Sequence, residues 1–181
     1  REMIRDIKEI LLTEEQIVGK VKELATKISE DYRNKDLLVV GILKGSVMFA
    51  SDLIKNITIP CEIDFMAVSS YGSSTETSGV VRILKDLDHS IEGKDIIIVE
   101  DIIDSGVTLD YLLKYLKTRK ANSIEIITFL TKPSRRKVDI QVKYCGFEVP
   151  DEFLVGYGLD FSEKYRNLPY VGILKEEVYK N

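Results

Sequence analysis

Histidine is almost absent from this sequence, which contains only His89 among its 181 residues. A mechanism built on a histidine base, or a metal site built on imidazole ligands, therefore has almost no material. Any acid–base chemistry must come from carboxylates or lysines.

Cysteine is also scarce. Cys61 and Cys145 stand alone in the sequence, without a C-x-x-C motif or a neighbouring histidine. This pattern indicates neither a zinc site nor a disulfide framework. Because it fits a reducing compartment, we expect a cytoplasmic protein.

Long hydrophobic runs and excess basic charge are missing too. The longest apolar stretch, Leu37 to Leu43, is far too short to span a bilayer. The N-terminus is charged and lacks the apolar core of a signal peptide, so we expect no membrane partner. A formal net charge of −4 argues against nucleic acid as the main partner, because nucleic acid requires a basic face.

Repeats, low-complexity tracts and linkers are absent as well. With 44% hydrophobic and 31% charged residues, the chain has enough material for a sizeable core. We therefore expect residues 1–181 to form a single domain.

The most informative stretch runs from Lys94 to Leu109. Residues 96–99 are an uninterrupted β-branched run, typical of a central strand in a parallel sheet. We expect an acidic turn after this strand, then a polar loop, and a helix in which leucines recur from Leu109. Loops at the carboxyl ends of strands are where open α/β sheets bind ligands. The acidic turn and the loop contain Glu100, Asp101, Asp104, Ser105, Gly106 and Thr108, and the apolar Val107 lies between the last two.

This loop has the chemistry of a site for a phosphorylated sugar. Ser105, Gly106 and Thr108 offer hydroxyls and accessible N–H groups at a helix N-terminus, which suits an anion. The carboxylates upstream would repel a bare phosphate, but they accept hydrogen bonds from hydroxyls and can hold Mg²⁺. An ordinary helix cap explains Asp104 or Ser105 alone equally well. It does not explain the whole set.

The segment from Val99 to Leu109, V-E-D-I-I-D-S-G-V-T-L, resembles the phosphoribosyl-pyrophosphate loop of the phosphoribosyltransferases. Its E-D-I-I-D-S-G form is similar to the hypoxanthine–guanine branch. The resemblance covers most of the chain through Leu43-Lys44-Gly45, Ser70-Tyr71, Lys132, and Phe153 to Arg166. It implies a type I phosphoribosyltransferase fold, which is an α/β domain with a parallel-sheet core flanked by helices and a small hood formed partly by the C-terminal segment.

The resemblance also implies purine salvage, in which phosphoribosyl pyrophosphate and hypoxanthine or guanine give IMP or GMP and pyrophosphate. Asp104 then handles the purine N7 proton as the catalytic residue, and residues 104–108 bind phosphate. Glu100 and Asp101 hold the ribose hydroxyls and Mg²⁺. Asp160 serves the metal or the base. A homo-oligomer, dimeric or tetrameric, is expected on the same ground.

A second polar loop contains Lys44 and Gly45 after the strand that ends at Leu43. On spacing alone, an exposed lysine beside a turn glycine is the favoured interpretation. The resemblance reverses this, because the matching loop of the family contacts pyrophosphate, often through a cis peptide bond at the lysine. Arg166 resembles the arginine that clamps pyrophosphate, a role suited to its bidentate fork.

The remaining site residues are assigned by resemblance to the purine and to a lid. Phe153 stacks on the base, backbone groups near Leu154 and Asp160 read its edge, and Lys132 faces the 6-oxo group. Without the resemblance, Lys132 would be interpreted as a surface residue and Phe153 as core. The Ser/Thr/Gly-rich residues 70–79 predict a mobile loop. It is either an inert hairpin tip or a lid that closes through Ser70 and Tyr71.

The other elements follow from periodicity and turn residues. Thr13 begins a predicted amphipathic helix with a capping box to Gln16. The G-x-G motif at Gly156 is rejected as a dinucleotide-binding fingerprint. The ranges expected are an apolar lead-in (4–12), helices (13–32 and 47–54), strands (37–43, 62–69, 80–84 and 124–130), a basic solvated turn or subunit contact (134–137) and a turn-forming passage (144–150). Two rivals remain open: a phosphoribosyltransferase for another base, and a regulatory protein that keeps the site as a sensor.

Overall fold

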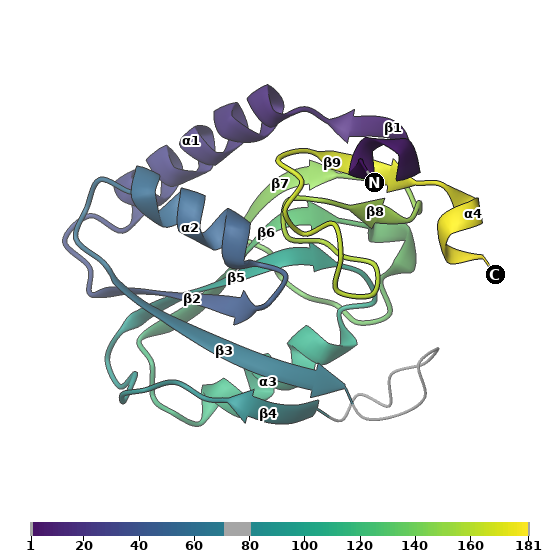
Figure 1. The fold of residues 1–181 in the computed structure, drawn as a ribbon. Coiled ribbons are helices and arrows are strands. Elements are labelled where there is room, and N and C mark those ends of the chain that lie inside the picture. Colours follow the sequence, from purple (N-terminus) through teal and green to yellow (C-terminus); the bar gives the residue numbers. More distant parts are fainter. Residues whose placement is uncertain (1, 71–80, 181) are drawn as a thin grey trace.

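The computed structural model describes residues 2–70 and 81–180, and a large, mostly parallel sheet forms its centre (Figure 1). Its six strands follow the order β4-β3-β2-β5-β6-β7, and only the edge strand β4 runs antiparallel to its neighbour. The strands are β2 (Leu37–Leu43), β3 (Glu62–Ser70), β4 (Val81–Lys85), β5 (Asp95–Ile103), β6 (Ser123–Thr131) and β7 (Tyr144–Glu148).

Helices cover both faces of this sheet. The helices α1 (Glu14–Asp31) and α2 (Val47–Asn56) pack on one face, and α3 (Val107–Lys117) packs on the other (Figure 1). The expected capping box is confirmed, because Thr13 Oγ1 accepts from Gln16 N at 3.2 Å and Gln16 Oε1 accepts from Thr13 N at 2.8 Å. The strands buried between these layers are apolar without alternation, as a sheet covered on both faces requires.

A small antiparallel sheet lies beyond the carboxyl ends of β2 and β5 and forms the hood (Figure 1). Its order is β1 (Ile7–Leu12), β9 (Val171–Leu174) and β8 (Leu154–Val155), with a 3₁₀ helix (Met3–Asp6) before β1 and the short α4 (Glu176–Tyr179) after β9. The expected hood is confirmed, and so is the parallel core flanked by helices. The segment 4–12, which we expected to be only an apolar lead-in, contains the hood strand β1.

The topology explains where a ligand can bind. The chain leaves β2 through α2 on one face and leaves β5 through α3 on the other, although these strands are direct neighbours with Gly41 opposite Val99. Neighbouring strands whose connections diverge in this way open a crevice at their carboxyl ends. Both polar loops identified in the sequence begin at that crevice.

Two expectations about local structure are wrong. Residues 144–148 form β7, parallel to β6, and not a turn. Gly146 within this strand permits close strand contact, because a Cβ there would lie 2.4 Å from the carbonyl oxygen of Phe129. The acidic pair Glu100 and Asp101 lies inside β5, because pairing with β6 continues to Ile103.

Other boundaries differ only slightly from expectation. The strand β4 begins at Val81, and α3 begins at Val107. Ser70 ends β3, while the rest of the proposed lid, including Tyr71, lies outside the described residues. Within residues 2–70 and 81–180, none of the helices has the length and apolar character needed to cross a membrane.

Candidate active site

Two adjoining cavities lie at the carboxyl edge of the large sheet. One, of about 220 Å³, is lined by the end of β5 and the start of α3. The other, of about 410 Å³, lies between the end of β6 and the hood, and its size is within the range of small-molecule sites. Ile102 and Asp104 line both cavities. A ligand spanning the two cavities would therefore pass Asp104.

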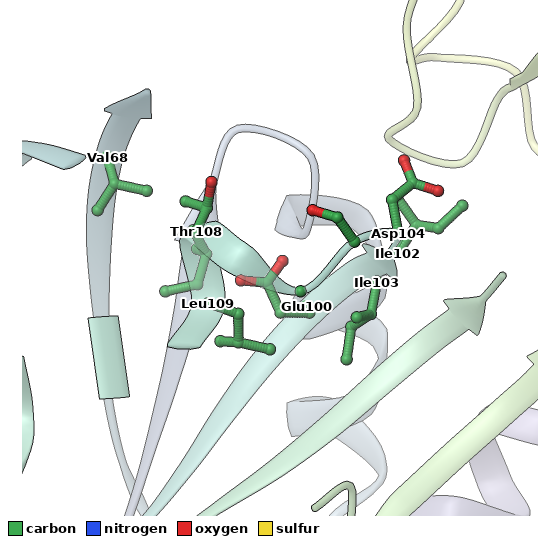
Figure 2. Close-up of a pocket in the computed structure, with 10 residues that line it drawn as sticks. Val68, Glu100, Ile102, Ile103, Asp104, Thr108 and Leu109 are labelled. Atoms are coloured by element: carbon green, nitrogen blue, oxygen red, sulfur yellow. The ribbon is translucent and has the colours of Figure 1, made fainter. Parts of the chain in front are cut away.

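The smaller cavity contains the predicted anion loop. Gly106 has φ +83°, and a Cβ there would lie 2.8 Å from Ile140 Cδ1, so conformation and space both favour glycine. Ser105 Oγ accepts from Val107 N at 3.3 Å at the beginning of α3. Figure 2 shows the polar ends of Glu100, Asp104 and Thr108 on one side of this segment. The arrangement combines a helix N-terminus, which favours anions, with carboxylates.

Glu100 lines this cavity, and it forms an acidic pair with Asp101, the next residue of β5. Burial raises the pKa of Glu100, and the neighbouring Asp101 charge raises it further. Burial also raises the pKa of Asp101, and nearby Asp104 adds to this effect. Asp101 Oδ1 accepts from the N–H of Ile102 at 2.7 Å. Two neighbouring carboxylates with raised pKa values are suited to a cation or to hydroxyl donors.

The acidic pair fits a magnesium ion that arrives together with a ligand. Among the described residues, no group of three or more His, Cys, Asp or Glu side chains is placed to enclose a metal. Magnesium usually binds through one or two carboxylates plus substrate phosphates and waters. The donor set Glu100 and Asp101 suits this mode. Asp160 accepts from Glu163 N at 2.9 Å and lies 3.5 Å from Arg166 Nη2, and its role as a further metal ligand stays a prediction.

Lys44 and Gly45 lie beside this pair. The peptide bond between Leu43 and Lys44 is cis, as the resemblance implied. A Cβ on Gly45 would lie 1.9 Å from Asp101 Oδ2, and a Cβ on Gly158 would lie 2.1 Å from the Gly45 carbonyl oxygen. The Lys44 loop is therefore held between the acidic strand and the hood, and both glycines permit the contact.

Arg166 joins the hood to the same region. Its Nη1 donates to the Gly158 carbonyl at 2.6 Å, and its buried Nε has no hydrogen-bond partner among the described residues. Glu163 contacts both residues predicted to bind pyrophosphate. Lys44 Nζ lies 2.8 Å from its Oε2, and Arg166 Nη2 lies 3.4 Å from its Oε1. The contact with Lys44 is the main cause of the lowered pKa of Glu163. The structure thus brings Lys44 and Arg166 together through a carboxylate.

The larger cavity contains the residues predicted to bind a purine. Lys132, Phe153 and Leu154 all line it. The side chain of Lys132 is only 12% exposed, which excludes its interpretation as a freely solvated surface lysine. Its Nζ donates to the carbonyl oxygen of Glu152 at 2.9 Å.

Sequence reasoning missed two features of this cavity. Tyr179 of α4 stacks on Phe153, with ring centroids 4.5 Å apart and planes at 24°. Arg135 lines the cavity and lies 3.3 Å from Asp151 Oδ2, and Arg136 donates to the Asp104 carbonyl at 3.2 Å. Arg135 of the basic cluster is therefore part of the site wall. Its position just after a parallel strand was the available signal. Nothing in the sequence marked Tyr179.

The fold agrees with comparisons with known proteins. A family model described as a phosphoribosyl transferase domain matches residues 8–162. The chain belongs to the phosphoribosyltransferase family. It is 58% identical over 179 residues to a hypoxanthine-guanine phosphoribosyltransferase of Staphylococcus aureus, covering 99% of this chain and 100% of that one. The corresponding Bacillus subtilis protein is 56% identical and is covered over 99% of both chains.

Solved structures lead to the same family. The crystal structure of a hypoxanthine phosphoribosyltransferase from Staphylococcus aureus superposes with a TM-score of 0.97. It is 57% identical, and the match covers 99% of this chain and 97% of that one. The type I phosphoribosyltransferase fold implied by the sequence is therefore confirmed.

Proposed function

We propose that this phosphoribosyltransferase acts in purine salvage, transferring the phosphoribosyl group from phosphoribosyl pyrophosphate to hypoxanthine or guanine. The products are the nucleoside monophosphate and pyrophosphate. The proposal treats residues 1–181 as a single phosphoribosyltransferase domain. The observation that carries it is the pair of cavities joined at Asp104, one with an anion loop and the other with Lys132 and Phe153.

The smaller cavity is assigned to the ribose and its phosphate. Residues 104–108 bind phosphate at the N-terminus of α3, where the helix dipole favours an anion. Glu100 and Asp101 accept from the ribose hydroxyls and would hold Mg²⁺. When bound, the metal supplies positive charge next to the departing pyrophosphate.

Lys44, Gly45 and Arg166 are assigned to pyrophosphate. Gly45 lets the backbone approach closely, as its contact with Asp101 indicates. Lys44 and Arg166 neutralise the negative charge that develops as the bond at the anomeric carbon breaks. The buried Nε of Arg166 has no hydrogen-bond partner among the described residues, so the donors of this guanidinium are not all satisfied within the protein.

The base is assigned to the larger cavity. Phe153 stacks on the purine ring, and backbone groups at Leu154 and Asp160 read its edge. Lys132 donates to the 6-oxo group, because an ammonium has three donors and no acceptor. Asp104, half-exposed between the cavities, takes the N7 proton as N9 attacks. A lid that includes Ser70 and Tyr71 stays a prediction.

Two further proposals concern the whole molecule. A homo-oligomer is supported by the exposed apolar side chains of Val18 and Met48, which line a groove of about 280 Å³ beside α1 and α2. A monomeric mass in light scattering would contradict it. A cytoplasmic location is supported by Cys61 and Cys145, which are both free thiols.

A spectrophotometric assay of the purified chain tests the reaction. Phosphoribosyl pyrophosphate and Mg²⁺ are supplied with hypoxanthine, guanine, xanthine, adenine or a pyrimidine. Nucleotide formed from hypoxanthine or guanine supports the proposal. Nucleotide from adenine or a pyrimidine alone would indicate the rival phosphoribosyltransferase, and no product with any base would favour the sensor.

A further inference from the structure

Among the residues that the structure describes, Glu163 is the one side chain that contacts both cations assigned to pyrophosphate. Lys44 Nζ donates to its Oε2 at 2.8 Å, and Arg166 Nη2 lies 3.4 Å from its Oε1. Lys44 is 119 residues away in the sequence, so this ion pair links the β2 loop to the hood. The carboxylate uses the same charge-assisted donors that a pyrophosphate oxygen would use.

The backbone holds Glu163 in this position. Its φ is +67°, and Ser162 and Tyr165 also have positive φ values, which non-glycine residues rarely adopt. The N–H of Glu163 donates to Asp160 Oδ2 at 2.9 Å. Phe161 and Lys164 form a two-way backbone hydrogen-bond pair, each at 3.0 Å, which closes the turn around it. The turn thus presents the carboxylate to the cations.

We propose that Glu163 sets the affinity for pyrophosphate by competing with it for Lys44 and Arg166. The inference rests on the proposed function, since it concerns the anion assigned to those cations. An incoming pyrophosphate must separate both cations from Glu163, and it then lies near an uncompensated carboxylate. When pyrophosphate departs, Glu163 returns to the cations and stabilises the empty site. Glu163 therefore favours release of this product.

The exposure of the pair limits how strong this competition can be. The side chains of Lys44 and Glu163 are 67% and 61% exposed, whereas that of Arg166 is 21% exposed. Exposed ion pairs change an equilibrium constant by a factor of about 1.4 to 5 each. Two such contacts allow a competition of about 2- to 25-fold. A weak competitor of this kind can hasten release without preventing binding.

The test is the affinity for magnesium pyrophosphate, measured by calorimetry on the full chain. Glu163→Gln keeps the shape of the side chain and removes its charge, and it is expected to bind pyrophosphate about 2- to 25-fold more tightly. The gain should shrink at high salt, because exposed charges are screened. Steady-state kinetics should show stronger product inhibition by pyrophosphate, with the KM for hypoxanthine unchanged.

Two control variants separate the possible causes. Glu92→Gln removes the same charge from an exposed position outside the site and should leave pyrophosphate affinity unchanged. If it tightens binding equally, net charge is the cause and the proposal fails. Unchanged or weaker binding by Glu163→Gln also overturns it, and weaker binding would mean that Glu163 orients the cations.

Arg166→Gln reports on the underlying site assignment. It should weaken pyrophosphate binding relative to the wild type. If wild type and Arg166→Gln bind pyrophosphate equally, or neither binds it, the pyrophosphate site itself is misassigned and the proposed function fails at that point. If Arg166→Gln weakens pyrophosphate binding as expected and Glu163→Gln does not tighten it, only the proposed competition is refuted.

Discussion

The ring of Tyr179 lies against the ring of Phe153, with 4.5 Å between centroids and 24° between planes. Phe161 adds an edge contact to Phe153, at 5.6 Å and 80°. Phe153 is thus held by two aromatic neighbours, one of them from the last helix of the chain. An aromatic ring fixed in this way loses little freedom when a flat base stacks on it.

Replacement of Tyr179 should weaken binding of the base. Tyr179→Ala removes one aromatic pair, and such pairs contribute about 0.5–1.5 kcal/mol beyond burial, so we expect the KM for hypoxanthine to rise about 2- to 12-fold. Tyr179→Phe keeps the stacked ring and should behave as the wild type. The KM for phosphoribosyl pyrophosphate should not change. Equal effects on both KM values would mean that α4 stabilises the fold rather than the base site.

Replacement of Asp104 should impair turnover without unfolding the protein. Asp104 lines both cavities and its side chain is 49% exposed, so Asp104→Asn disturbs little packing. Loss of general acid–base catalysis typically costs about 10²–10⁴-fold in rate. Pre-steady-state turnover with saturating substrates measures this loss. A variant with wild-type turnover would remove Asp104 from the mechanism.

Magnesium should be required for binding of the sugar substrate. Glu100 and Asp101 are two partly buried carboxylates whose pKa values are raised by burial, and a cation would relieve their repulsion. We expect calorimetry to show much weaker binding of phosphoribosyl pyrophosphate after chelation. The double variant Glu100→Ala, Asp101→Ala should lose most of this metal dependence. Equal affinity with and without magnesium would refute the metal role.

Asp86 should contribute to stability in a pH-dependent way. Arg119 forms two hydrogen bonds with it, at 2.8 and 2.6 Å, and Tyr115 Oη donates at 2.6 Å. The Arg119 guanidinium is the main cause of the lowered pKa of Asp86. Because the folded pKa lies below the unfolded value of about 3.9, this stability is present at neutral pH and is lost as the pH falls below that value.

Urea unfolding of Asp86→Asn measures that contribution. The carboxylate is about one-third exposed, so after allowance for solvent screening we expect a loss of about 1 kcal/mol at neutral pH. The difference from the wild type should shrink in acid. Glu23→Gln, which removes an exposed surface pair with Lys20, serves as the control and should change stability little. A loss that persists unchanged in acid would exclude the ionic contribution.

The sequence predicted the parts of the fold that depend on local pattern. The strand 37–43 and the helix after Thr13 were found because uniform apolar runs and a capping box are local signals. The role of β1 was not predicted, because a hood strand is defined by its partner β9, which is about 160 residues away in the sequence. The turn expected over 144–150 was wrong because β7 is defined by its pairing with β6, a segment outside that passage.

The site residues also divide into those with a local sequence signal and those without one. Residues 100–108 are consecutive and carry their own chemical logic, so their joint position could be predicted. Glu163, Tyr179 and Arg135 become part of the site only through contacts with distant segments. Nothing local distinguishes them from ordinary surface residues. The assignment of Lys132 required the family resemblance, and its low exposure came from the structure.

The measurement that tests the central claim most directly compares kcat/KM for hypoxanthine and adenine in the wild type and in Lys132→Ala. A largely buried ammonium that donates to a 6-oxo group leaves an unpaired donor when adenine binds, so the wild type should prefer hypoxanthine by about 10⁴–10⁵. Lys132→Ala should lose about 10- to 150-fold in kcat/KM for hypoxanthine, the cost of one hydrogen bond to a charged group. Its affinity for phosphoribosyl pyrophosphate should be unchanged. A wild-type enzyme that uses adenine equally well, or a variant with unchanged hypoxanthine kinetics, would contradict the account.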